Sequence, residues 1–230
     1  MGRQLTVSLA AAAEDRTRAA LGIARTAADP MPAFVTLIGA VAALLDDARA
    51  GAPPHQRDPY SRIECRRGCT ACCYIPLAVT VVEAIAATAM VLRDEAALAR
   101  IRTARAQPSG AERWRRRIPC MLLHDGACAI YAQRPLPCRA YVSLSAARCD
   151  EALASGDSGE LLAVPTLDLP REHATELRAG IRAACSAEGL QDAHVELGSA
   201  LTLLVGDPGR VKRWLEGERV FAAPEGSSGA

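Results

Sequence analysis

Four cysteines fall within nine positions of the segment 63–76, which reads IECRRGCTACCYIP: Cys65, Cys69, Cys72 and Cys73. Thiols this close together serve as disulfide partners, as ligands for a metal, or as a redox-active pair. The chain has nine cysteines in all, and an odd number cannot be paired completely. Metal binding is therefore the leading interpretation, provided that the chain works in a reducing compartment.

Such a compartment is expected because no secretory signal is evident. A short apolar stretch near the N-terminus is interrupted by Glu14 and Asp15 before a hydrophobic signal core can form. The apolar run 34–45 is 12 residues long, which is too short to span a bilayer. We therefore expect a soluble, cytoplasmic protein without a membrane partner.

The charge balance argues against a nucleic-acid partner. The formal net charge is +1, so no broad basic field would attract an anionic polymer. The run ERWRRR at 112–117 is locally basic, but no patch of interleaved aromatic residues accompanies it. We interpret this run as a solvated helix face or turn.

A second cysteine group follows in IPCMLLHDGACAIYAQRPLPCRAY, residues 118–141, with Cys120, Cys128 and Cys138. The two prolines of RPLPC stiffen the turn that carries the last of these thiols. Either a tetrahedral zinc ion or a cubane iron–sulfur cluster takes four thiolates. The spacing does not choose between these two metals.

The dipeptide Asp-Gly at 125–126 predicts the turn of a β-hairpin within this group. A two-residue loop would place Cys120 and Cys128 on opposite faces of the hairpin. A three-residue loop over 124–126, with the glycine in the left-handed conformation, would instead pair Leu122 with Cys128. The two cysteines would then be diagonal neighbours on one face, about 7–8 Å apart, and could share a metal. We predict the three-residue loop.

Cys72 and Cys73 are adjacent in the chain, which limits how they could bind a metal. Neighbouring side chains of an extended chain point to opposite sides, so these two thiols are poor ligands for a single metal. Either they serve two centres, or one of them packs outside the site.

Cys185 differs from both, because it shares a helical stripe with Leu177 and Ile181, which indicates a core cysteine rather than a ligand.

Arginines flank both cysteine groups. Four thiolates around a zinc ion or a cluster carry about two net negative charges, which nearby guanidinium groups would offset while favouring the thiolate form. The alternative is that these arginines are simply solvated at the surface. The arginines in question are Arg66, Arg67, Arg134 and Arg139.

The composition predicts a mainly α fold, because aromatic residues make up only 3% of the chain while alanine and leucine are abundant. We expect a helical domain with a small β-hairpin and an irregular cysteine-rich metal-binding core. Local signals are a break at Asp29-Pro30, a capping box of Thr80 and Glu83, a stop at Gly189 and a start at Asp207-Pro208. The predicted helices cover 10–29, the apolar stretch 34–45, 80–105, 171–188, 193–205 and 208–217.

The chain divides into four predicted parts. Residues 1–60 form an N-terminal helical extension with a proline-rich linker, and 61–150 form the cysteine-cluster core. Residues 151–221 form C-terminal helices that pack on this core, and the tail 222–230 is disordered.

The combination of CRRGCTACC with C…GACAIYAQRPLPCR resembles the YkgJ-like cysteine-cluster family (CxxCxxCC), described as zinc- or iron-chelating, over residues 62–150. The stretch 130–139 matches the family's IYxxRPxxCR portion, whereas Pro119-Cys120 reverses the Cys-Pro order of a common form. The resemblance implies a zinc or iron–sulfur site. Its candidate ligands are Cys65, Cys69, Cys72, Cys73, Cys120, Cys128, Cys138 and, as an eighth, Cys149.

Three functional hypotheses follow from these patterns. The leading one is a protein that holds zinc or an iron–sulfur cluster at one cysteine-bound centre or at two. The second is an enzyme that modifies a protein or peptide, because flagellin lysine methylases are similar in carrying a related cluster segment. The third is a helical interaction module stapled by zinc. Radical S-adenosylmethionine enzymes share the C-x3-C-x2-C spacing, but the long alternation of strands and helices that they need does not follow here.

Overall fold

The computed structural model describes residues 8–51, 58–104 and 110–221, and their fold is mainly α, as predicted. The helices are α1 (Leu9–Thr26), α2 (Met31–Ala50), α4 (Val81–Val91), α5 (Glu95–Thr103), α6 (Gly110–Arg115), α7 (Leu136–Ala140), α8 (Ala146–Ser155), α9 (Ser158–Leu162), α10 (Leu169–Ala187), α11 (Leu197–Gly206) and α12 (Arg210–Leu215), with the short 3-10 helices η1 (Asp58–Arg62), η2 (Ala71–Tyr74) and η3 (Tyr131–Gln133). The strands are β1 (Ala78–Thr80), β2 (Leu123–His124), β3 (Ala127–Cys128) and β4 (His194–Glu196). The tail predicted to be disordered lies outside the described residues.

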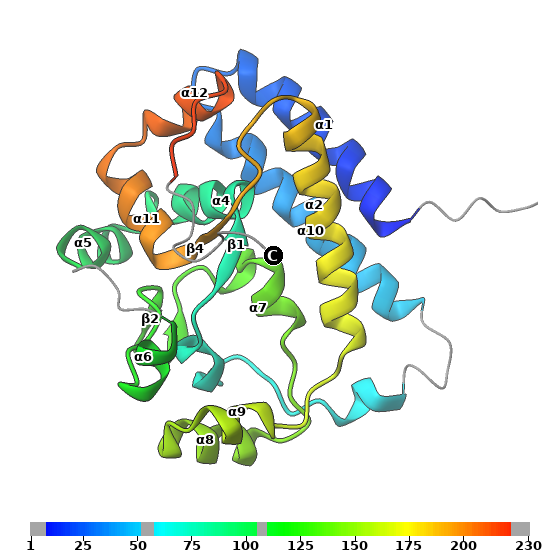
Figure 1. Cartoon of the computed structure of the whole chain (residues 1–230), viewed down its shortest axis with the longest axis vertical. Helices are drawn as coiled ribbons and strands as arrows, with labels where there is room; N and C mark the ends of the chain where they lie inside the picture. Colours follow the sequence, from blue (N-terminus) through cyan, green and yellow to red (C-terminus); the bar gives the residue numbers. More distant parts are fainter. Residues whose placement is uncertain (1–7, 52–57, 105–109, 222–230) are drawn as a thin grey trace, which may run out of the picture.

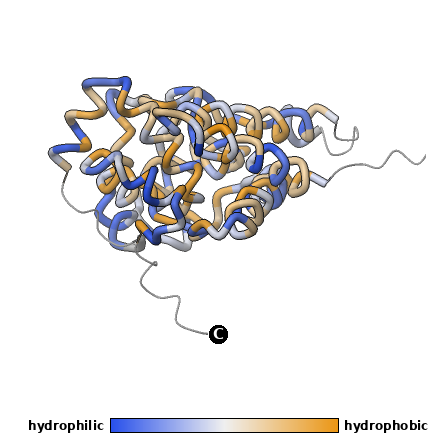
Figure 2. Tube along the Cα trace, turned by 90° about the horizontal axis from the view of Figure 1, so that it is seen from above, coloured by the Kyte–Doolittle hydropathy of each residue, from blue (hydrophilic) through white to orange (hydrophobic). Residues whose placement is uncertain are grey.

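Helices α1, α2 and α10 lie side by side and contact one another, so the two ends of the chain share one core (Figure 1). Helices α4 and α11 continue this core, and the buried Phe34 of α2 meets Trp214 of α12 edge to face at 5.8 Å between ring centroids. Apolar stretches gather toward the interior of the helix layers, and hydrophilic stretches lie mostly at the periphery (Figure 2). The cysteine segments extend from this core.

Helix α2 is longer than the apolar run seen in the sequence, and its 20 residues make it long and apolar enough to cross a membrane by length and composition alone. Core helices of water-soluble proteins meet the same criterion. Here Phe34, Leu37, Ile38, Val41 and Leu45 are buried against the rest of the molecule. The absence of a membrane partner remains a prediction.

A close approach between α1 and α10 depends on Gly180. A Cβ atom at this position would lie 2.0 Å from the carbonyl oxygen of Ala10 and 2.8 Å from its carbonyl carbon. Both are backbone atoms, so a side chain could be accommodated only if the two helices moved apart. We expect Gly180→Ala to lower the free energy of unfolding by about 1–3 kcal/mol in urea denaturation, despite the higher helix propensity of alanine.

Gly22 of α1 provides the matched control, because a Cβ atom there would meet nothing within 4 Å. Gly22→Ala should raise stability by up to about 1 kcal/mol through helix propensity alone. Equal stability of the two variants would contradict the steric role of Gly180.

Three predicted element boundaries are wrong. The helix predicted over 80–105 is two helices, because Asp94 caps a new one by accepting a hydrogen bond from the Ala97 N–H at 3.0 Å. The helix predicted over 193–205 begins only at Leu197, because the preceding residues form β4, which pairs with β1. The last helix begins at Arg210 with Gly209 as its N-cap rather than at Asp207-Pro208.

Other local predictions are confirmed. Thr80 and Glu83 form the capping box at the start of α4, and Gly189, with φ of +71°, follows the end of α10 in the left-handed conformation that favours glycine. Between α9 and α10, Thr166 forms an isolated β-bridge with Ser143. This bridge leads into α10 from the cysteine region.

A second, small hydrophobic cluster lies between helices α6, α8 and α9. Its buried members are Trp114, Ala152 and Val164, and the indole N–H of Trp114 donates to the carbonyl oxygen of Asp157 at 3.2 Å. Helices α8 and α9 lie at the end of the molecule opposite α12 (Figure 1). The cysteine segments occupy the region between this small cluster and the main core.

Candidate metal centre

The two cysteine groups, distant in sequence, meet in space. The backbone N–H of Cys120 donates to the carbonyl oxygen of Cys73 at 2.8 Å, which joins the segment 63–76 directly to the segment 118–141. The eight candidate cysteines line two adjoining cavities, which we call the inner and the outer cavity. All eight are free thiols in the structure and none is fully exposed.

The inner cavity has a volume of about 70 Å³, which is room for an ion or a few water molecules. Four cysteines line this cavity and not the outer one, and we call them the inner set: Cys73, Cys120, Cys128 and Cys138. They come from η2, from the chain before β2, from β3 and from α7. Burial raises the pKa of Cys120, Cys128 and Cys138, as expected for thiols removed from water.

The hairpin between Cys120 and Cys128 has a two-residue loop, so the predicted three-residue loop is wrong. Leu123 pairs with Cys128, and the turn residues Asp125 and Gly126 have φ of +47° and +70°. Positive φ at both positions is the type I′ arrangement that an Asp-Gly pair favours. A two-residue loop was expected to place Cys120 and Cys128 on opposite faces, and this does not occur. The ladder is only two residues long, so Cys120 lies outside it and lines the same cavity as Cys128.

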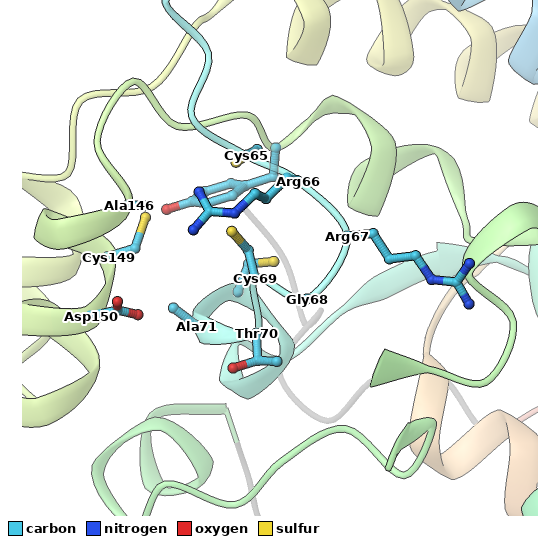
Figure 3. Close-up of a pocket in the computed structure, with 12 residues that line it drawn as sticks. Cys65, Arg66, Arg67, Gly68, Cys69, Thr70, Ala71, Ala146, Cys149 and Asp150 are labelled. Atoms are coloured by element: carbon cyan, nitrogen blue, oxygen red, sulfur yellow. The ribbon is translucent and has the colours of Figure 1, made fainter. Parts of the chain in front are cut away.

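The outer cavity is larger, at about 260 Å³. Cys65 and Cys149 line this cavity alone, while Cys69 and Cys72 line both cavities. Figure 3 shows Cys65, Cys69 and Cys149 around it, with the Arg66 guanidinium group beside them. Cys149, whose role the sequence left undecided, therefore lies with the thiols of the first group.

Cys72 and Cys73 do not point to opposite sides, because the premise of an extended chain is wrong. Both lie in the 3-10 helix η2, and their side chains hydrogen-bond to each other. This hydrogen bond lowers the pKa of Cys72 and raises that of Cys73. Cys72 lies at the junction of the two cavities, since it lines both.

Backbone N–H groups point at several sulfurs, which is the environment that thiolate ligands require. The N–H of Ser143 donates to Cys65 Sγ at 3.1 Å. The N–H groups of Leu122 and Ile130, each two residues after a cysteine, hydrogen-bond to Cys120 and Cys128 and lower the pKa that burial raises.

Glu83 positions the turn that carries Cys138. Its carboxylate is fully buried, accepts from the N–H of Leu136 at 2.8 Å, and pairs with Arg178 at 3.3 Å. The capping box therefore ties the start of α4 to the first residue of α7. The sequence revealed the capping box but not this third partner.

Positive charge at the inner set comes from two arginines. Arg113, only 3% exposed, donates to the Cys73 carbonyl oxygen at 3.2 Å and lowers the pKa of Cys120. Arg134 lowers the pKa of Cys72, Cys128 and Cys138, and its Nε is buried without a hydrogen-bond partner among the described residues. An unpartnered guanidinium N–H beside thiols fits a site that holds thiolates.

Arg113 contradicts the interpretation of 112–117 as a wholly solvated run. Arg113 and its neighbour Trp114 are both buried, whereas Arg115, Arg116 and Arg117 are exposed. The tryptophan inside the basic run was the available signal, since a large aromatic side chain is more often buried than solvated.

Among the flanking arginines, Arg66 and Arg134 lie beside thiols, and the other two have different partners. The Arg67 side chain points away from the outer cavity (Figure 3). Its guanidinium group lies over the Tyr131 ring, 5.7 Å from the ring centroid. Arg139 donates to the carbonyl oxygen of Arg134 at 3.1 Å, which fixes the turn before Cys138.

Cys185 is a core residue, as predicted, because it is 2% exposed on the buried face of α10. Burial raises the pKa of its thiol to about 12. Among the described residues, no three Cys, His, Asp or Glu side chains converge closely enough to hold a metal ion in the conformation shown. A cysteine has a single side-chain torsion, so a change of rotamer moves the sulfur of a lining thiol without moving the backbone.

Comparison with known families agrees with this geometry. Residues 64–156 match the family described as CxxCxxCC, "putative zinc- or iron-chelating domain". The match spans both cysteine groups and ends at Gly156, the C-cap residue of α8. It therefore includes every residue that lines the two cavities except Leu197. No curated protein and no solved structure gave a significant match to the chain.

Proposed function

We propose that this chain holds a zinc ion or an iron–sulfur cluster through the inner set, because residues 64–156 match the CxxCxxCC family, described as a "putative zinc- or iron-chelating domain". One observation carries the proposal: of the six thiols that line the small inner cavity, four come from separate segments and do not line the outer cavity. The inner set is Cys73, Cys120, Cys128 and Cys138.

The chemistry of the inner set suits a closed, all-thiolate centre. Zinc and iron–sulfur clusters both accept four cysteine sulfurs, and such a site leaves no position for a substrate. A bound zinc ion would supply a rigid cross-link, whereas a bound cluster would supply a one-electron carrier. Arg113 and Arg134 offset the negative charge of the thiolates, and the N–H groups of Leu122 and Ile130 hydrogen-bond to two of the sulfurs.

A closed centre favours a structural or electron-carrying role over a catalytic one for the inner set. We place the protein in the cytoplasm, a proposal supported by nine free cysteines, which a reducing compartment would keep unpaired. The formal net charge of +1 supports the further proposal that neither nucleic acid nor an anionic membrane surface is its partner.

Metal analysis of anaerobically purified protein tests the proposal and identifies the metal. A zinc protein is colourless, whereas an iron–sulfur protein is brown and absorbs broadly in the visible range. Elemental analysis should find zinc, or iron with acid-labile sulfide, bound to the full-length chain. Protein that binds neither zinc nor a reconstituted cluster would contradict the proposal.

Replacing one inner ligand should remove this metal. We expect Cys128→Ser to lose metal from the inner set and to destabilise the domain, because ligand binding free energy is coupled to folding. Elemental analysis and thermal unfolding of the variant measure the two effects.

Cys185→Ser is the matched control, because it changes a buried thiol on α10 that lines neither cavity. It should retain its metal even if the core loses some stability. Unchanged metal content in Cys128→Ser would refute the assignment.

A further inference from the structure

We infer that the outer cavity is a second metal site, in which Cys65, Cys69, Cys72 and Cys149 bind a thiophilic ion or cluster of their own. The inference rests on the proposed function in one respect: the inner set is taken to form the first centre. The chain would then hold two four-thiolate centres side by side.

The division into two sets follows from where each thiol lies. The inner set supplies four sulfurs to its cavity, which satisfies either a tetrahedral zinc ion or a cubane cluster. Cys65 and Cys149 line only the outer cavity, and Cys69 and Cys72 also line it. These remaining cysteines number four, so each cavity has a complete ligand set and no thiol is left over.

The backbone holds Cys65 and Cys69 toward the outer cavity. Cys69 N–H donates to the Arg66 carbonyl oxygen at 3.0 Å, which closes a tight turn between the two cysteines. Gly68, with φ of +96°, occupies this turn in a conformation that other residues rarely adopt. The turn leaves both thiols on the cavity side of the loop (Figure 3).

Cys149 reaches the same place because α8 is fastened to the cysteine loop. The Glu64 carboxylate accepts from the N–H of Ala146, the first residue of α8, at 2.7 Å. The Glu64 N–H in turn donates to the Ser143 carbonyl oxygen at 3.1 Å. Cys149 lies one helical turn into α8 and therefore faces Cys65 across the cavity.

Ser143 holds a hydrogen-bond donor against the Cys65 thiol. It is 1% exposed, and its N–H donates to Cys65 Sγ at 3.1 Å, while its hydroxyl group donates to the carbonyl oxygen of Ser145 at 3.0 Å. A buried N–H group that donates to a sulfur stabilises the thiolate form. Arg66 adds a positive charge at the cavity wall (Figure 3).

The two centres differ in access to solvent. The outer cavity has about 260 Å³ against about 70 Å³ for the inner one, and the exposed side chains of Arg66 and Asp150 form part of its wall. Metal in the outer site should therefore exchange faster with chelators than metal in the inner site. An outer centre of this kind is also the one at which an added ligand could approach.

The test is the metal-binding stoichiometry of the full-length chain. Apo-protein under a phosphine reductant is titrated with Co²⁺ alone, and thiolate-to-cobalt charge-transfer absorption reports binding. We expect two equivalents for the wild-type chain and for Cys185→Ser, but one each for Cys149→Ser and Cys128→Ser. The double variant should bind none. Cys65→Ser provides a second outer variant, and circular dichroism shows whether each variant folds.

The outcomes separate the two proposals. If the wild-type chain bound only one equivalent and both Cys149→Ser and Cys128→Ser bound none, the chain would have one shared centre and the inference would be overturned. If the wild-type chain bound only one equivalent and Cys128→Ser alone bound none, the outer site would be overturned while the proposed function stood. If the wild-type chain bound only one equivalent and Cys149→Ser and Cys65→Ser alone bound none, the outer site would be supported and the inner one refuted. No cobalt binding would overturn both.

Discussion

Replacing Glu83 with alanine is expected to lower the free energy of unfolding by about 3–5 kcal/mol, the usual cost of removing one partner from a buried ion pair. The Glu83 side chain is fully buried and accepts hydrogen bonds from the N–H groups of Thr80 and Leu136, each at 2.8 Å. Truncation would leave both N–H groups and the guanidinium group of Arg178 without this acceptor. Urea denaturation of the metal-loaded protein measures the loss.

The same change should weaken metal binding, because the N–H of Leu136 begins the turn that carries Cys138. Glu83→Gln keeps one acceptor oxygen without the charge, so its stability should fall between that of the alanine variant and the wild type. Glu95→Ala alters an exposed glutamate in the first turn of α5 and should change stability by less than about 0.5 kcal/mol. Equal stabilities for Glu83→Ala and Glu95→Ala would show that the buried carboxylate contributes nothing.

Local signals in the sequence predicted the helices well where propensity and tertiary packing agree. The apolar stripe of α2, the capping box at Thr80 and the left-handed Gly189 all follow from residues close together in the chain. Strand β4 was missed because its three residues are extended only by pairing with β1, which lies more than a hundred residues earlier. Tertiary pairing of this kind leaves no periodic trace in so short a segment.

The meeting of the two cysteine groups was also predictable, because sulfur chemistry demands several ligands at one point. Its internal geometry was not. Whether Cys72 and Cys73 diverge depends on the backbone between them, which is a 3-10 helix rather than an extended chain. The position of Arg113 depends on contacts with Cys73 and with Glu196 of β4, and neither lies near it in sequence.

The structure combines two regions of unequal apolar content. The main core joins α1, α2, α4, α10 and α11 through large buried side chains. The cysteine region contacts this core through Leu122, Ile130, Leu136 and Ala140. The rest of the region has a separate cluster whose buried members among the described residues are Trp114, Ala152 and Val164, and its hairpin strands are two residues long. A hairpin of that size is unstable by itself, and a region with so little apolar burial of its own depends on covalent or metal cross-links.

Removing the metal is therefore expected to unfold the cysteine region while the helical core persists. Structural zinc contributes on the order of 10 kcal/mol of apparent binding free energy in small zinc domains, which exceeds what the small cluster around Trp114 can supply. After treatment with a strong chelator, amide hydrogen exchange should lose protection throughout 62–77 and 118–156. The amides of α1, α2 and α10 should stay protected.

Restoring the metal is the control that separates this coupling from irreversible damage by the chelator. Readdition of zinc, or anaerobic reconstitution of the cluster, should return protection to both segments, whereas magnesium should not, because thiolates prefer softer ions. The small cluster packs against Cys149, so α8 should lose protection together with the hairpin. If metal-free protein kept full protection over 118–141, packing alone would hold the cysteines in place, and folding of this region would not depend on the metal.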